Sequence, residues 1–172
     1  MTEGETTARL TLRPLGPDDA PALHAIVSDL AVVRELGPFW WPLDFDKTAS
    51  RARPHIGDGF VWGLFEGDTL IGSVGVTGGE IGYMLRQDRW GRGLAREAAT
   101  AALDRAFGPM ALQQVGARVW ADNAPSLALL HRLGFVETGR HTEMAPARGV
   151  RTAGVDLRLD SAAWRALRGQ GE

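Results

Sequence analysis

The fold is decided by the stretch EIGYMLRQDRWGRGLA, residues 80–95. Its first part, Glu80 to Arg86, is a β-rich run, and a turn containing Gly91 and Gly93 then opens a helical pattern. Glycines at a helix start let the backbone approach an anion, which the unsatisfied N–H groups and the helix dipole attract. The turn therefore predicts phosphate binding, although a tight strand-to-helix turn without a ligand has the same Gly-x-Gly pattern.

Two further β-rich runs precede this stretch, and turn residues separate all three. Phe60 to Glu66 and Thr69 to Thr77 are joined by Gly67-Asp68, and Gly78-Gly79 leads into the third run. This spacing predicts an antiparallel meander. A dinucleotide-binding fold is excluded, because it needs Gly-x-Gly-x-x-Gly in a parallel βαβ unit and Arg96 stands at the third glycine.

The remaining periodicities predict the other elements. The strands are expected at Leu10 to Leu15, Val115 to Trp120, Thr138 to Met144 and Val150 to Leu159. One helix is expected from the turn Gly16-Pro17-Asp18-Asp19 to about Leu30. Further helices are expected at Phe45 to Arg53, Gly93 to Phe107, Ala124 to Leu133 and Ala162 to Leu167. This order predicts an α/β (α+β) fold with a single mixed, mostly antiparallel sheet of about seven strands flanked by helices. Without a visible repeat or linker, we expect one domain over residues 1–172.

The composition excludes several classes of function. Of the 172 residues 44% are hydrophobic, and no run approaches the roughly 20 apolar residues of a membrane span. The absence of cysteine excludes thiolate nucleophiles and Cys-ligated zinc, and the net charge of -2 gives no general attraction to nucleic acid. The only lysine, Lys47, is not in a phosphate-loop motif. Because the first residues lack a secretory signal, we expect a cytoplasmic protein with no membrane and no nucleic-acid partner.

Motifs on both sides of the turn resemble the GNAT superfamily of N-acetyltransferases. Gly93 and Ala95 match its acetyl-CoA motif, Gln/Arg-x-x-Gly-x-Gly/Ala, in which Trp90 takes the Gln/Arg position. Trp-Gly-x-Gly-x-Ala after Glu-Ile-Gly-Tyr resembles the ribosomal-protein alanine acetyltransferase branch. The motifs Asn-Ala-Pro-Ser at 123–126 and Leu-Gly-Phe at 133–135 extend the likeness, which covers about residues 9–165.

The resemblance implies that acetyl-CoA is the cosubstrate and that the sheet splays between its fourth and fifth strands to admit the pantetheine arm. Backbone groups of Met84 and Leu85 would pair with that arm. Arg89 or Arg92 would meet the 3′-phosphate, unless both are solvated surface residues. The residues expected to bind acetyl-CoA are Met84, Leu85, Arg89, Trp90, Gly91, Arg92, Gly93, Leu94, Ala95, Asn123 and Ser126.

Acyl transfer to an amine needs a proton for the departing thiolate and a base for the amine. In the family a tyrosine seven residues after Asn123 often supplies the proton, but Leu130 stands there. The branch suggests Ser126 instead, for which an ordinary first-turn serine is the other interpretation. Glu80 and Glu143 are the candidate bases, unless they are exposed strand residues with no role. The four histidines share no metal-ligand spacing, so no metal is expected.

Trp40 and Trp41 lie in a loop and, with the loop Ala145 to Gly149, are expected to bind the acceptor; a buried core is the other interpretation. The sequence predicts an N-acetyltransferase that passes acetyl from acetyl-CoA directly to a primary amine, on a protein N-terminus or a small molecule, in a ternary complex. A non-catalytic acyl-CoA-binding module and a phosphate-binding interaction domain are the alternatives. By resemblance a homodimer is also possible.

Overall fold

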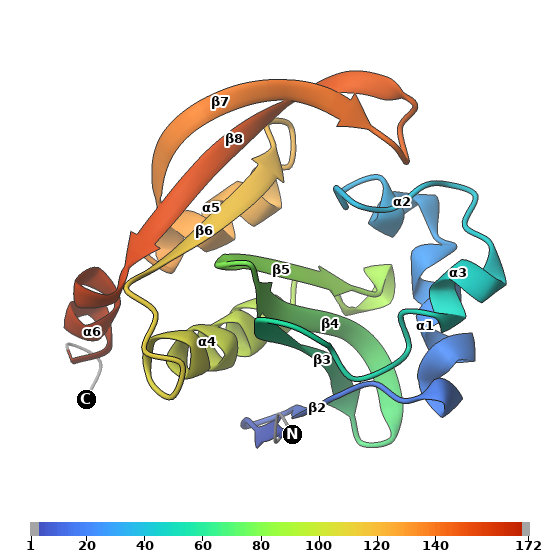
Figure 1. Cartoon of the computed structure of the whole chain (residues 1–172), viewed down its shortest axis with the longest axis horizontal. Coiled ribbons are helices and arrows are strands. Elements are labelled where there is room, and N and C mark those ends of the chain that lie inside the picture. Colours follow the sequence, from blue (N-terminus) through green and yellow to red (C-terminus); the bar gives the residue numbers. More distant parts are fainter. Residues whose placement is uncertain (1–3, 170–172) are drawn as a thin grey trace.

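The computed structural model describes residues 4–169, so residues 1–3 and 170–172 of the predicted domain lie outside it. In chain order its elements are β1 (Glu5–Thr6), β2 (Thr11–Arg13), η1 (Pro17–Asp19), α1 (Ala20–Val27), α2 (Leu30–Val33), α3 (Phe45–Ala49), β3 (Gly59–Glu66), β4 (Thr69–Thr77), β5 (Glu80–Leu85), η2 (Gln87–Arg89), α4 (Leu94–Phe107), β6 (Gln114–Trp120), α5 (Ala124–Arg132), β7 (Val136–Ala145), β8 (Val150–Asp160) and α6 (Ser161–Gly169). Strands β6 to β8 arch away from β3 to β5 (Figure 1).

Across residues 4–169 the strands form one eight-stranded sheet in the order β1-β2-β3-β4-β5-β6-β8-β7. Only β5 and β6 run parallel, and the other neighbouring strands are antiparallel. The turn between β4 and β5 has φ of +57° at Gly78 and +79° at Gly79. Positive φ at both positions gives the type I′ turn that suits a hairpin, and glycine adopts it without strain. The predicted mixed, mostly antiparallel sheet is confirmed.

The sheet splits between β5 and β6. These strands pair at a single position, Glu80 with Gly116, where the Gly116 N–H donates to the Gly79 carbonyl at 2.8 Å. Beyond this point the strands diverge, which leaves one edge of β5 without a neighbouring strand in the described chain. The split lies where the sequence predicted the splay between the fourth and fifth strands.

Helices cover both faces of the sheet. On one face α4 presents a stripe of small, fully buried residues, Ala98, Ala102 and Ala106, that allows close packing against the strands. On the other face Leu23 and Val27 of α1 pack into a separate cluster of buried residues. Because strand side chains alternate between faces, each strand of the meander contributes to both cores. The two packed layers hold the split in the sheet at a fixed position.

Two details differ from the sequence predictions. The sheet has eight strands rather than about seven, because the two-residue edge strand β1 is too short to show a periodicity. The helix predicted to run to about Leu30 ends at Val27, and a short helix that the sequence did not predict, α2, begins at Leu30, where the Asp29 side chain accepts a hydrogen bond from the Ala31 N–H and caps it. Among residues 4–169 no helix combines the length and apolar character needed to cross a membrane.

Candidate active site

A cleft opens where β5 and β6 separate, and residues from both faces of the sheet line it. Tyr83 of β5 points toward α4 and α5, where it packs against the core cluster of that side. Its neighbours Gly82 and Met84 point the opposite way, and Met84 packs into the cluster around α1. The cleft therefore has an α4 face and an α1 face, reached from opposite sides of the sheet.

The glycine-rich turn, residues 90–95, borders the cleft and leads into α4. Gly91 and Gly93 have φ of +73° and +76°, a left-handed conformation that suits glycine. Gly93 is the N-cap and has no side chain to satisfy the first N–H groups of the 14-residue helix. These free donors and the helix dipole give the turn the chemistry of a phosphate site.

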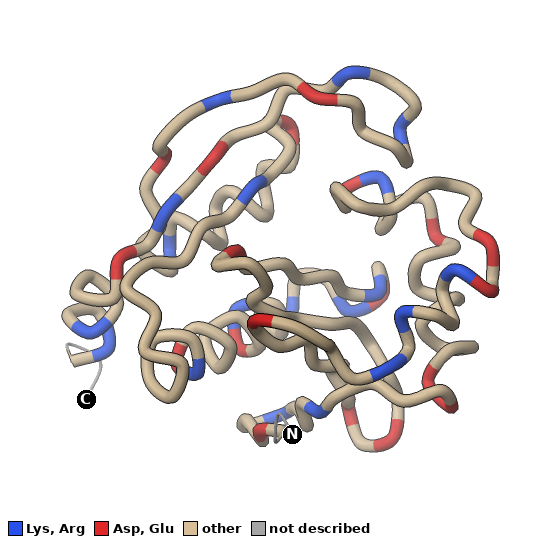
Figure 2. The backbone as a smooth tube through the Cα atoms, in the orientation of Figure 1, with Lys and Arg blue, Asp and Glu red and all other residues tan. Residues whose placement is uncertain are grey.

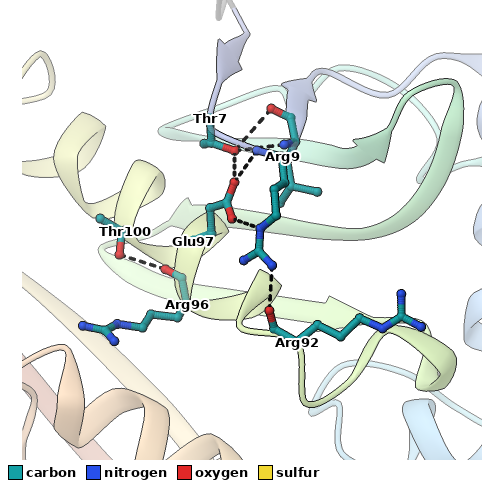
Figure 3. A network of polar contacts seen from close by, with 7 residues as sticks. Thr7, Arg9, Arg92, Arg96, Glu97 and Thr100 are labelled. Atoms are coloured by element: carbon teal, nitrogen blue, oxygen red, sulfur yellow. Dashed lines mark hydrogen bonds and ion pairs between the residues drawn. The ribbon is translucent and has the colours of Figure 1, made fainter.

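An ion pair braces this turn from the amino-terminal segment (Figure 3). Arg9 Nε lies 2.7 Å from Glu97 Oε2, and Arg9 Nη1 donates to the Arg92 carbonyl at 2.8 Å. Glu97 also accepts hydrogen bonds from the Thr7 hydroxyl and the Arg9 N–H. Burial raises the pKa of Glu97, but the hydrogen bonds from Thr7 and Arg9 outweigh it and hold that pKa below its ordinary value. A charged Glu97 thus links the turn to the rest of the fold.

The arginines near the turn are not arranged as the sequence suggested. Arg89 lines the cleft, but its guanidinium already pairs with Glu66 and with Asp88. Arg92 offers its carbonyl to the brace and is not a lining residue. Arg96 of α4 and Arg132 of α5 do line the cleft, and neither has an ion-pair partner within residues 4–169.

Charges of both signs are spread along the backbone, and blue and red segments alternate in Figure 2. The view in Figure 2 therefore shows no broad face of one sign that would bind an extended polyanion. The arginines that line the cleft without an ion-pair partner in residues 4–169 are local: Arg96 and Arg132 on α4 and α5, and Arg51 and Arg53 after α3. Such a placement suits a small phosphorylated ligand.

The unpaired edge of β5 offers backbone groups to the cleft. Met84 and Leu85 lie at the end of β5, beyond the single pair with β6. The Leu85 carbonyl accepts a hydrogen bond from Trp90 Nε1 at 2.9 Å, which ties the strand end to the glycine-rich turn. A strand edge with free N–H and C=O groups can pair with an extended ligand as an added strand. The amide groups of a pantetheine arm have this character.

Ser126 meets a tyrosine that comes from β5. The Tyr83 hydroxyl lies 2.6 Å from Ser126 Oγ, within hydrogen-bond distance and at the α4 face of the cleft. Burial raises the pKa of Tyr83 to about 12, and the hydrogen bond to Ser126 offsets part of that rise. Tyr83 is therefore a neutral phenol at physiological pH. Two hydroxyl groups in contact can pass a proton between the protein interior and the cleft.

Asn123 and Leu130 fix the helix that carries Ser126. The Asn123 side chain accepts a hydrogen bond from the Ser126 N–H at 3.2 Å and is the N-cap of α5. Leu130 is fully buried in the α4-side core, so it fills space at the position where the family often has a tyrosine. The serine hydroxyl remains free of the cap and available to Tyr83.

The two predicted bases both line the cleft, in different surroundings. Glu80 is exposed at the start of β5, and the Cβ that Gly116 lacks would touch its side chain at 3.4 Å. Glu143 of β7 lies 3.2 Å from Arg118 Nη2 and 3.4 Å from His141 Nε2. Glu143 is therefore already paired with positive or polarisable groups, whereas Glu80 faces solvent.

The predicted acceptor residues are placed differently from the expectation. Trp40 and Trp41 are exposed and lie outside the cleft lining, and their neighbour Phe39 lines the wall instead. The reason is local: Phe39 turns inward beneath the Arg51 guanidinium, 4.2 Å from its ring centre, while the Trp41 indole donates to the Ser28 carbonyl. Phe39, rather than the two tryptophans, is the aromatic residue of this loop that lines the cleft.

Arg148 ties the loop between β7 and β8 to Glu35 and Asp122, which line the cleft, whereas residues 145–149, expected at the acceptor, do not line it. The Arg148 guanidinium lies 2.7 Å from Asp122 Oδ2 and 3.0 Å from Glu35 Oε2, and it donates to the Arg34 carbonyl. The hydrogen bond that Asp122 accepts from Arg148 lowers the pKa of the Asp122 carboxyl. The side chain of Arg148 is only 9% exposed, so these bonds join the end of α2, the start of α5 and the loop into one rim.

Sequence reasoning missed Tyr83, Arg96 and Arg132 as site residues. Arg132 follows Ser126 by six residues, a spacing that turns it to a different side of the helix, so helical periodicity gave no signal for it. Strand alternation places Tyr83 and its neighbour Gly82 on opposite faces of the sheet. The contact between Tyr83 and Ser126 had no local signal, because the split of the sheet creates it.

Comparison with known proteins agrees with this geometry. The family model described as an acetyltransferase (GNAT) domain matches residues 9–136. An uncharacterized N-acetyltransferase, p20, of Bacillus licheniformis is 31% identical over 163 residues, which cover 83% of this chain and 88% of that protein.

Solved structures share the fold at lower identity. A spermidine N-acetyltransferase chimera from Vibrio cholerae superposes with a TM-score of 0.79 at 21% identity and covers 92% of this chain and 99% of its own. A ribosomal-protein-S5-alanine acetyltransferase from Vibrio fischeri superposes with a TM-score of 0.73 at 19% identity and covers 94% of this chain and 98% of its own. The solved structures show the fold, and the sequence matches also show the family. The chain belongs to the GNAT family and is an acetyltransferase.

Proposed function

We propose that the protein transfers the acetyl group of acetyl-CoA directly to a primary amine within a ternary complex. The turn at residues 90–95 would hold the pyrophosphate, the edge of β5 the pantetheine arm, and Arg96 with Arg132 the 3′-phosphate. The observation that carries the proposal is the hydrogen bond between Tyr83 and Ser126 beside that strand edge. It puts a proton source where the thiol end of the arm would lie.

The reaction follows from this arrangement in a balanced sequence. The acceptor ammonium first loses a proton to a base or to solvent, and its nitrogen then attacks the thioester carbonyl. A C–N bond forms, the C–S bond breaks, and the nitrogen releases a second proton to solvent as it becomes an amide. The departing thiolate takes a proton from Ser126 Oγ, and Tyr83 re-protonates Ser126 before solvent restores the phenol. The absence of cysteine from the chain supports direct transfer rather than a thioester-linked acyl-enzyme.

The acceptor would enter from the α1 face, because Tyr83 and Ser126 occupy the α4 face. Gly82 leaves open space on the α1 face, with no atom within 4 Å of the position of a Cβ. Two proteins of this fold are named for spermidine and for the alanine of ribosomal protein S5, which are both amines. We extend this chemistry to the present chain as a primary amine, either a protein N-terminus or a small molecule.

Calorimetric titration with acetyl-CoA, followed by thiol release in the presence of N-terminal peptides, aminoglycosides, polyamines and free amino acids, tests the proposal. Stoichiometric binding and acceptor-dependent release by at least one class are expected, and Ser126→Ala should lower the release rate while acetyl-CoA still binds. No acceptor-dependent release across the whole panel would oppose transfer to an amine. An unchanged rate in Ser126→Ala would remove Ser126 as the proton donor.

A further inference from the structure

A histidine on the α1 face of the cleft has no place in the reaction as described so far. His141 of β7 lines the cleft, and its side chain is 19% exposed. Its Nδ1 lies 3.0 Å from Asp156 Oδ1, and its Nε2 lies 3.4 Å from Glu143 Oε1. Arg118 of β6 contacts both carboxylates, at 3.3 Å from Asp156 and 3.2 Å from Glu143.

The backbone of β8 makes room for this imidazole. His141 is paired with Gly154, and a Cβ at Gly154 would lie 2.3 Å from Nε2 and 2.4 Å from Cε1 of the ring. Gly154 has no positive φ, so its conformation does not require glycine. A glycine also costs stability in the middle of a strand. We attribute the presence of glycine at position 154 to the space that the His141 ring needs. The ring lies flat over β8 and so extends from β7 toward β6.

The cluster is on the side of the sheet that faces the acceptor. Val155 and Leu157 of β8 point into the α4-side core. Because side chains alternate along a strand, positions 154 and 156 are on the α1 face. Glu80 and Gly82 of β5 share that face. Ser126 and Tyr83 lie on the other face, and an acyl group held in the split would have the histidine and the hydroxyl pair on opposite sides.

The neighbours of His141 define which nitrogen exchanges a proton. Asp156 is the nearer of the two carboxylates, and its charge favours the proton of neutral imidazole at Nδ1, a buried atom that makes no hydrogen bond within residues 4–169; the lone pair is then at Nε2. When Nε2 takes a second proton, the resulting charge lies between Asp156 and Glu143. Arg118 balances one of these two carboxylates.

On this basis, and resting on the proposed function, we propose that His141, in ion-pair distance of Asp156, accepts the proton that the acceptor ammonium must lose before it attacks. One N–H bond of the ammonium breaks, one N–H bond forms at Nε2, and the imidazolium later releases this proton to solvent. Glu143, which the sequence offered as a base, is then the partner that faces the charged ring. Glu80 remains free to contact the acceptor.

The test compares pH–rate profiles of acetyl transfer for the wild type, His141→Gln and Asp156→Asn, with the acceptor found in the panel above. His131→Gln is the matched control, because His131 of α5 also faces a carboxylate, 3.8 Å away on Glu137, but does not line the cleft. We expect His141→Gln to lower kcat/KM about 10²-fold and to lose the rising limb of the profile, with the control unchanged. Acetyl-CoA binding and the midpoint of thermal unfolding are measured for each variant.

A second variant keeps the proposal testable if the ion-pair changes disturb folding. Gly154→Ala retains all four charged or titratable side chains but displaces the ring, and we expect it to lower the rate as well. Imidazole added to His141→Ala should restore part of the lost activity, which a merely structural role would not allow. A wild type that releases no thiol with any acceptor defeats the proposed function itself. A transferring wild type whose rate and pH profile are unaltered in His141→Gln overturns only this inference.

Discussion

Tyr83→Phe removes one oxygen atom from the centre of the site. The hydroxyl lost lies 2.6 Å from Ser126 Oγ, near the short end of the range for O–H···O hydrogen bonds. Because the phenyl ring stays in place, the free energy of unfolding should fall by only about 1 kcal/mol, the net value of one hydrogen bond. The effect on catalysis should be larger, because Ser126 loses the group that re-protonates it.

The magnitudes separate a relay from a passive contact. Ser126→Ala removes the direct donor and should lower kcat about 10²-fold, whereas Tyr83→Phe acts through Ser126 and should lower it about tenfold. The double variant should be no worse than Ser126→Ala alone, since both changes interrupt the same path. Initial rates at saturating acetyl-CoA give these values. Additive losses, or a Tyr83→Phe rate equal to the wild type, would refute the relay.

The ionisation of Tyr83 can be followed directly. It is the only tyrosine in the chain, so the absorbance of tyrosinate reports this one residue. We expect its midpoint near the pKa of about 12, well above the ordinary value of 10.0. The pH profile of Tyr83→Phe should therefore keep its shape over the neutral range. Titration close to the ordinary value would show that the phenol is not buried against Ser126.

Three further changes test other parts of the site. Glu97→Gln should destabilise the fold by about 1 kcal/mol at neutral pH, which lowers the melting temperature, and should weaken acetyl-CoA binding. Because the pKa of Glu97 in the folded protein is depressed, the difference in melting temperature should disappear as the pH falls below about 4.5. A difference that stays constant with pH would contradict the role of charged Glu97. Gly82→Leu should raise the KM of the acceptor several-fold and leave acetyl-CoA affinity intact, with Gly82→Ala as the small control, and a loss of acetyl-CoA binding would place the ligands on the wrong faces. Arg96→Ala and Arg132→Ala should each weaken CoA binding about tenfold but spare dephospho-CoA, which lacks the 3′-phosphate. Arg140→Ala is the control, because Arg140 does not line the cleft. Equal losses for both ligands would remove Arg96 and Arg132 from that phosphate.

Much of the fold could be predicted because its signals are local. The hairpin turn at Gly78-Gly79 needs positive φ at both positions, and the alanine stripe of α4 repeats at helical spacing. The short helix α2 was missed, because four residues that begin at the Asp29 cap are too few to show a helical period. The strand β1 was missed because two residues carry no period.

Only the part of the site that consists of one continuous segment could be predicted from the sequence. The glycine-rich turn is contiguous, so the sequence alone could single it out as a candidate phosphate site. Tyr83 and Ser126 are far apart in the chain and meet because α5 packs beside the split, and the ring of His141 depends on the glycine opposite it on β8. Trp40 and Trp41 show the converse case, in which the loop that holds them turns Phe39 inward. Such placements follow from tertiary packing, which no local pattern encodes.

The central claim, that the turn at residues 90–95 holds acetyl-CoA, is tested most directly by calorimetric titration of the wild type and of Gly93→Val with acetyl-CoA. Gly93 has φ of +76°, which valine adopts only with strain, so the variant should lose the orientation of the N–H groups at the start of α4. We predict one molecule bound per wild-type chain and an affinity at least tenfold weaker in a folded Gly93→Val. Equal affinities, or no binding by the wild type, would contradict the account.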